Sequence, residues 1–143
     1  MSILPDGYRL SERQQDMQPV AIHAYLTSSY WAKGIPLDIV EKSIKGSLCV
    51  GVFHEDDQIS FARLVTDMAT FAYLADVYVL AGHGKQGVAK AMVQYLQDHQ
   101  ELTQIRNWLL MTADAQSLYS SLGWQQVADP RKTMQRSFPD IYQ

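Results

Sequence analysis

The segment DVYVLAGHGKQGVAKAMVQYL, residues 76–96, contains the pattern that decides the fold. An apolar, β-rich run leads into GHGKQG, residues 82–87, and a helix-like run begins directly after it. These six letters match G-x-G-x-x-G, in which glycines let backbone N–H groups approach a phosphate at a helix N-terminus. The segment therefore predicts a strand, a glycine loop and a helix, with a phosphate-bearing ligand at residues 82–90. The alternative is a tight strand-to-helix turn that binds nothing.

The position of the loop decides whether that ligand is NAD. A dinucleotide domain has the motif near its start and an acidic residue at the end of the following strand. Here the loop lies in mid-chain, and Glu101 has about the expected offset but precedes the next strand-like run. Val88 and Ala89 replace the lysine and hydroxyl residue of a P-loop. Both nucleotide folds are therefore disfavoured, and another phosphate ligand remains.

The runs before the loop predict two helices followed by antiparallel strands. Polar turns separate β-rich runs at residues 47–53, 59–67 and 71–80, and such short turns form hairpins. Ahead of them we expect a short strand at residues 7–10. Proline at a first helical turn and glycine after a last one predict helices from Pro19 to about Gly34 and from Pro36 to Gly46.

The runs after the loop predict one parallel crossover. Apolar residues at helical spacing follow the loop, and a strand is expected at residues 106–111. A short helix at 114–122 and a closing pair of strands at 124–127 and 133–137 complete the chain. The predicted fold is therefore α+β, an αβα sandwich with a mixed, mostly antiparallel sheet and one strand–helix–strand crossover.

Composition predicts one soluble domain over residues 1–143. The chain is 47% hydrophobic and 19% charged, and its net charge of −3 disfavours nucleic-acid binding. It contains neither a signal-peptide pattern nor an apolar run long enough for a membrane span, so we expect a cytoplasmic protein without membrane contact. The only cysteine, Cys49, lies in an apolar run and is expected to be buried. The histidines have no metal-site spacing.

Several stretches taken together resemble the GNAT superfamily of acetyl-CoA-dependent N-acetyltransferases. These stretches are ATFAYLADVYVL (69–80), GHGKQGVAKAMV (82–93) and LLMTADAQSLYSSLGW (109–124). Residues 28–52 and 59–67 are also similar to the N-terminal half of small bacterial members. The resemblance covers nearly the whole chain and implies acetyl transfer from acetyl-CoA to a small-molecule or peptide amine, without a metal.

The resemblance implies that the glycine loop holds the CoA pyrophosphate. The family pattern R/Q-x-x-G-x-G/A matches at Gly87 and Ala89, but Gly84 stands where the family has Arg or Gln, and Lys85 replaces a usual glycine. The pantetheine arm is expected beside the strand that ends at Val79, where this strand splays from the next parallel one. The residues expected to bind acetyl-CoA are Val77, Tyr78, Val79, Gly82, His83, Gly84, Lys85, Gln86, Gly87, Val88, Ala89, Lys90 and Thr112.

Two residues are candidates for the chemistry. Tyr119 matches the family tyrosine near the CoA sulfur, where it acts as general acid or hydrogen-bond donor; the alternative is an aromatic residue of the core. Asp76 interrupts an apolar strand, and a carboxylate there is costly to bury without a partner. It either deprotonates or binds the amine, or it is structural.

Three residues are candidates for the acceptor pocket. Tyr30 and Trp31 lie at the junction of the first two helices, and Asp67 lies in a turn; core packing and turn formation are the alternatives. The missing Arg or Gln at Gly84 motivates a second hypothesis, a non-catalytic CoA-binding or protein-interaction module of the same fold. A homodimer is left open.

Overall fold

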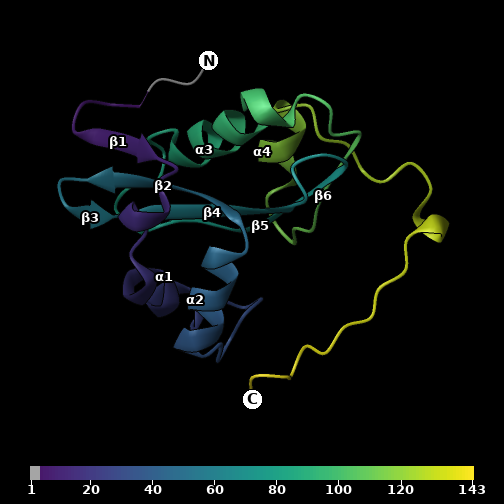
Figure 1. The fold of residues 1–143 in the computed structure, drawn as a ribbon, viewed down its shortest axis with the longest axis horizontal. Helices are drawn as coiled ribbons and strands as arrows, with labels where there is room; N and C mark the ends of the chain where they lie inside the picture. Colours follow the sequence, from purple (N-terminus) through teal and green to yellow (C-terminus); the bar gives the residue numbers. More distant parts are fainter. Residues whose placement is uncertain (1–3) are drawn as a thin grey trace.

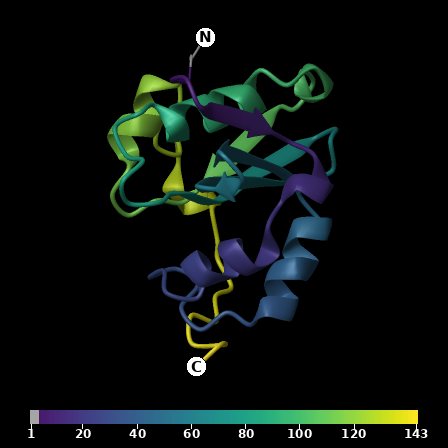
Figure 2. The same cartoon turned by 90° about the vertical axis from the view of Figure 1, so that its left-hand side faces the viewer.

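A mixed sheet separates two pairs of helices in residues 4–143, the part of the chain that the computed structural model describes (Figure 1). The strands are β1 (Tyr8–Ser11), β2 (Leu48–His54), β3 (Asp57–Gln58), β4 (Ser60–Thr66), β5 (Phe71–Val79) and β6 (Asn107–Leu110). The helices are α1 (Pro19–Leu26), α2 (Leu37–Lys45), α3 (Val88–Gln97) and α4 (Gln116–Ser121). Helices α1 and α2 cover one face of the sheet, and α3 and α4 cover the other (Figures 1 and 2).

The sheet has the predicted mixed topology. Its strands are ordered β1-β2-β4-β5-β6, and the short β3 pairs with β2 beside this path. All neighbours are antiparallel except β5 and β6, which are parallel and joined through α3. The α+β prediction with one parallel crossover is therefore confirmed.

Alternation along the strands creates a core on each face of the sheet. In β4, Phe61 packs on the side of α1 and α2 with Ile22, whereas Ala62 and Leu64 pack on the side of α3 with Met92. All five side chains are fully buried. Burying a large apolar side chain contributes about 1.5–3 kcal/mol, so the two cores fix the positions of the helices on the sheet.

The first helix ends earlier than its pattern predicted. Helix α1 stops at Leu26, and residues 27–36 fold into a compact connection closed by a 2.9 Å hydrogen bond from the Gly34 N–H to the Thr27 carbonyl. The Ser29 hydroxyl donates to the Leu26 carbonyl over 2.7 Å, as serine does where it competes with helical hydrogen bonds. This connection brings the Trp31 indole within 2.8 Å of the Asp76 carboxylate in β5.

The predicted closing strands at 124–127 and 133–137 are wrong. After β6 the structure has helix α4 and a 3-10 turn at Pro130–Lys132, but no strand in the described residues that follow Leu110. The Trp124 indole donates to Gln97 Oε1 of α3 over 2.6 Å and so ties the start of the segment to that helix. Residues 131–143 are exposed and pair with no strand of the sheet.

Candidate active site

A β-bulge in β5 determines where the side chain of Asp76 points. The β4–β5 register passes from Phe61–Tyr78 to Arg63–Ala75, so that Ala62 faces two residues of β5. Asp76 has φ of 57°, a left-handed conformation that is uncommon for residues other than glycine. Bulges of this kind re-aim a side chain and increase the local twist of the strand.

The carboxylate of Asp76 has a partner for each oxygen. Oδ1 accepts from the Trp31 indole over 2.8 Å, and Oδ2 accepts from Arg63 Nε over 2.6 Å. The side chain of Asp76 is only 9% exposed, so these bonds satisfy the buried charge. Arg63 also donates to the Ser47 hydroxyl over 3.2 Å. The cluster ties β4, β5 and the α1–α2 connection together.

Strand β5 continues beyond the end of its parallel partner. The β5–β6 ladder runs from Phe71–Asn107 to Leu74–Leu110, whereas β5 extends to Val79. Residues 75–79 therefore have β4 on one side and no β6 pairing on the other. The resemblance implied a splay at residues 108–111, but residues 108–110 pair with residues 72–74 of β5. The ladder ends there, and residues 75–79 form a strand edge that an extended, amide-bearing ligand can approach.

A cleft of about 910 Å³ lies over this edge. Of the predicted catalytic and acceptor residues, it brings together Tyr30, Trp31, Asp76 and Tyr119. Of the predicted cofactor residues, it is lined by Val77, Tyr78, Val79, Ala89 and Thr112. Its volume falls in the range of small-molecule sites. Residues far apart in the sequence therefore converge on one site.

Tyr119 of α4 presents a buried phenol in the wall of this cleft. Its side chain is 8% exposed and packs edge-on against Trp124, with ring centroids 6.1 Å apart. Burial raises the pKa of its phenol, and the negative charge of Asp114 adds to the effect. A phenol with a raised pKa keeps its proton at neutral pH, so Tyr119 is suited to donate a proton rather than to accept one.

The glycine loop between β5 and α3 presents an open surface. Gly82 and Gly87 have φ of 93° and 77°, and a Cβ added at Gly82, Gly84 or Gly87 would meet nothing within 4 Å. Gly87 is the N-cap of α3, and no side chain caps this helix. The first N–H groups of α3 are thus available to an anion, which fits a pyrophosphate.

Other loop residues differ in what they offer a ligand. Lys85 and Lys90 are exposed cations, and Gln86 is exposed as well. Val88 is 2% exposed and packs into the core, so its backbone is the part near the loop surface. His83 is turned toward β1, since its Nδ1 lies 2.8 Å from the Tyr8 hydroxyl.

Three predicted residues have local structural roles. The ring of Tyr78 stacks on Tyr25 with centroids 4.0 Å apart and forms part of the cleft floor. The Thr112 hydroxyl accepts from the Ala115 N–H over 3.1 Å and shapes the entry to α4. Asp67 does not reach the cleft: its carboxylate accepts from Ala69 and Thr70 in the β4–β5 turn, and these bonds lower its pKa.

Sequence reasoning missed several residues of the cleft. Arg63, Tyr73, Asp114, Gln135 and Tyr142 also line it. A charged residue among the apolar residues at the centre of β4 was a usable sign for Arg63. No local pattern pointed to Gln135 and Tyr142, because the last segment reaches the cleft only through tertiary structure.

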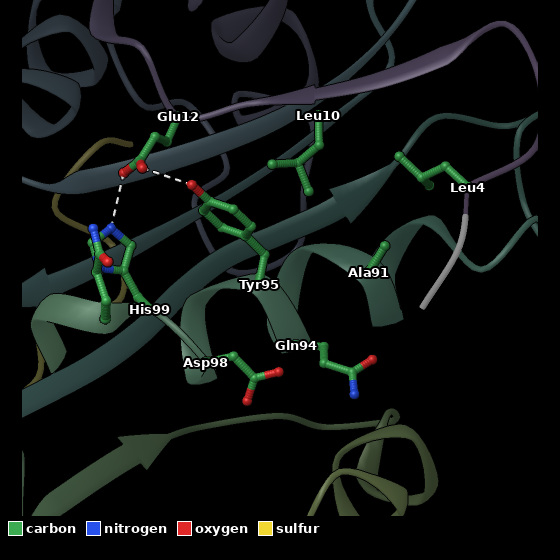
Figure 3. Close-up of a pocket in the computed structure, with 9 residues that line it drawn as sticks. Leu4, Leu10, Glu12, Ala91, Gln94, Tyr95, Asp98 and His99 are labelled. Carbon is green, nitrogen blue, oxygen red and sulfur yellow. Dashed lines mark hydrogen bonds and ion pairs between the residues drawn. The ribbon is translucent and has the colours of Figure 1, made fainter. Parts of the chain in front are cut away.

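A second cavity, of about 590 Å³, lies between β1 and α3 (Figure 3). Glu12 accepts from the Tyr95 hydroxyl over 2.6 Å and lies 3.1 Å from His99 Nε2, and these contacts lower the pKa of Glu12. Leu4 and Leu10 line it on the apolar side. None of the predicted site residues lies there.

Cys49 does not line the cleft. Cys49 is 1% exposed, and burial raises its pKa to about 12, which confirms the prediction of a buried hydrophobic residue. Within residues 4–143, no group of three His, Cys, Asp or Glu side chains is arranged to hold a metal ion. In the same range, no helix has the length and hydropathy to cross a membrane.

Comparisons with known proteins agree with this geometry. Residues 45–126 match the model of the acetyltransferase (GNAT) domain. A candidate acetyltransferase of the GNAT family from Xanthomonas campestris pv. campestris is 37% identical in sequence, with a TM-score of 0.93 over 97% of this chain and 98% of that chain. A candidate acetyltransferase of Gibberella zeae is 29% identical over 78% of this chain and 75% of its own length.

A more distant relative shares the fold alone. Glucosamine-6-phosphate N-acetyltransferase from Arabidopsis thaliana is 12% identical, with a TM-score of 0.66 over 92% of this chain and 98% of that chain. The family match covers more than half of the chain, and the Xanthomonas structure matches nearly all of it. The chain therefore belongs to the GNAT acetyltransferase family.

Proposed function

We propose that this protein transfers an acetyl group from acetyl-CoA to a primary amine, in a ternary complex without a covalent enzyme intermediate. One observation carries the proposal: the unpaired edge of β5 and the buried phenol of Tyr119 face the same cleft, at the end of the sheet where the glycine loop begins. Cys49 is buried and does not line the cleft, so it is not available as a nucleophile there.

Backbone groups of the glycine loop and of β5 would make most of the contacts with CoA. The N–H groups of residues 82–89 would hold the pyrophosphate, with Lys85 and Lys90 adding positive charge. The β5 edge at residues 77–79 would pair with the pantetheine amides. When bound, acetyl-CoA supplies the activated acetyl group. Gly84 removes a side-chain contact that the family usually has, but it leaves this backbone arrangement intact.

Asp76 and Trp31 would form the acceptor side of the site. Both oxygens of Asp76 already accept hydrogen bonds, so we assign it the role of holding Trp31 and Arg63 in position rather than that of general base. Its charge also favours an ammonium group at the cleft before the amine loses its proton to solvent.

Tyr119 would complete the reaction as the acid. The neutral amine attacks the thioester carbonyl and forms the C–N bond, and its nitrogen releases one proton to solvent. The C–S bond breaks, and the phenol gives its proton to the departing sulfur. Solvent then returns a proton to the phenolate. General acids typically contribute 10²–10⁴-fold to the rate.

The experiment is a direct assay of acetyl transfer. The protein is incubated with acetyl-CoA and a panel of primary amines, and the acetylated products are identified by mass spectrometry. Acetyl-CoA should also raise the melting temperature, whereas NAD should not. Binding of acetyl-CoA without transfer to any amine would favour the non-catalytic module, for which Gly84 is the motivating observation.

A further inference from the structure

The last eleven residues cross from one helical layer of the protein to the other. Residues 133–143, here called the C-terminal strap, leave the side of α4 and end beside the α1–α2 connection (Figures 1 and 2). Most of the strap is exposed, and Met134 is 95% exposed. A chain this exposed has little core packing to order it, so its few contacts determine its path.

Those contacts lie at the two ends of the strap. At the near end, Gln135 Nε2 lies 3.7 Å from Met111 Sδ, just after β6. At the far end, the Gln143 amide donates to the Lys33 carbonyl over 3.3 Å. Next to it, Gly34 has φ of 84°, and a Cβ at this position would lie 2.9 Å from the Tyr142 carbonyl oxygen. Only a glycine permits this close approach.

Near both ends, the strap borders the candidate active site. Gln135 and Tyr142 line the same cleft as Trp31 and Tyr119. A strap anchored on both layers therefore stands as a wall on the acceptor side, opposite a floor made by β5. An acceptor must fit beneath this wall to reach Tyr119.

The charges of the cleft indicate what fits there. Arg63 contributes one positive charge, and Asp76 and Asp114 contribute two negative charges, so the three together carry a net charge of −1. The rings of Tyr30 and Trp31 are in contact, Tyr142 also lines the cleft, and aromatic faces attract cations.

We propose that the C-terminal strap restricts the acceptor to small primary amines and excludes the side chains and termini of folded proteins. The reaction itself rests on the function proposed above, whereas the wall can be tested without any activity. Tyr142 and Gln135 are on this account specificity-determining residues.

The first test displaces the strap and measures access to the cleft. Gly34→Ala adds a Cβ against the Tyr142 carbonyl and strains the backbone. Gly7→Ala is the matched control, because Gly7 has a similar φ of 89° but its Cβ would meet nothing nearer than 3.7 Å. Ala75→Cys, half-buried in the cleft, is the reporter. The native Cys49 is too buried to react.

The reporter is labelled in each background with iodoacetamide and with a bulky maleimide dye. We expect Gly34→Ala to speed labelling by the dye about tenfold and labelling by iodoacetamide less than twofold, since only the large reagent needs the strap to open. The Gly7→Ala control should change neither rate. Equal dye labelling in the Gly34→Ala and control backgrounds would overturn the proposal.

The second test removes a wall side chain without adding a Cβ at Gly34. Tyr142→Ala deletes the ring that lines the cleft and leaves the Gly34 backbone unstrained. This variant should also speed labelling of the reporter by the dye more than labelling by iodoacetamide. Dye labelling at the rate of the otherwise unchanged reporter protein would refute the proposed wall.

A third test compares the rates at which a short alkylamine and a lysine-containing peptide are acetylated. Gly34→Ala should raise the rate with the peptide relative to the alkylamine at least about fivefold, because the strap is displaced. An unchanged ratio contradicts the specificity role. If labelling follows the expected pattern but no variant acetylates any amine, the proposed acetyltransferase function is refuted. The proposal that the strap limits access to the cleft is then still supported by the labelling.

Discussion

Removing the carboxylate of Asp76 should destabilise the fold strongly. The side chain is 9% exposed and accepts from Trp31 and Arg63, whose own side chain is 21% exposed. Breaking a buried ion pair by removing one partner costs about 3–5 kcal/mol. Arg63 retains some water and its bond to Ser47, so we expect about 3 kcal/mol for Asp76→Ala, at the lower end of that range.

Urea unfolding of a double-mutant cycle tests this value. Asp76→Ala, Arg63→Met and the double variant are compared with the wild-type protein. The double variant should cost about 2 kcal/mol less than the sum of the single variants, because it leaves no unpaired charge. Asp76→Asn should fall between Asp76→Ala and the wild type, since asparagine tolerates the left-handed conformation and keeps one acceptor.

The reasoning would be refuted by an Asp76→Ala cost below about 1 kcal/mol or by additive single variants. Kinetics separate the structural role from that of a base. Loss of a general base lowers kcat by about 10²–10⁴-fold. Loss of the support for Trp31 instead raises KM for the amine, and this is the expected result for Asp76→Asn.

Four further predictions concern the cleft, the loop and the β1–α3 seam. Tyr119→Phe should lower kcat about 100-fold while leaving the acetyl-CoA Kd unchanged by calorimetry; an unchanged kcat would remove Tyr119 as the acid. Gly84→Arg should tighten acetyl-CoA binding, because its side chain enters open space beside the loop; weaker binding would mean that the ligand takes another path. Lys85→Gly should raise stability by about 1 kcal/mol in urea, since Lys85 has φ of 62°; a loss of stability would refute this. Glu12→Gln should cost stability at neutral pH, because the folded protein lowers the pKa of Glu12 below 4.5, and this cost should shrink as the pH falls through that lowered value. A cost that grows in acid would contradict the sign.

The order of the secondary structure could be read from the sequence because local patterns encode it. Alternation in residues 59–67 reflects a strand with two opposite faces, and helical spacing after Gly87 reflects burial of one helix face; both elements formed as predicted. The end of α1 could not be predicted from the local pattern, since it depends on the hydrogen bond from the Gly34 N–H to the Thr27 carbonyl. The closing strands failed for a similar reason, because the bond between Trp124 and Gln97 is tertiary.

The residues of the candidate site were likewise predictable in part. Residues on regular elements, such as Val79 and Tyr119, reached the cleft because their positions follow from the topology. Asp67 was misplaced as a pocket candidate because turn aspartates usually bond to their own backbone, as this one does. The partners of Asp76 could not be predicted from the sequence. Arg63 reaches Asp76 because of the register at the β-bulge, and Trp31 reaches it because the α1–α2 connection folds back.

Hydrogen exchange with and without acetyl-CoA tests the central claim most directly, because it reports the site of binding amide by amide. If acetyl-CoA lies along the open edge of β5 and on the glycine loop, exchange at residues 77–79 and 82–89 should slow at saturating acetyl-CoA. The same amides should be unaffected by NAD. Protection confined to the seam between β1 and α3, around Glu12 and Tyr95, or no protection at all, would contradict the account.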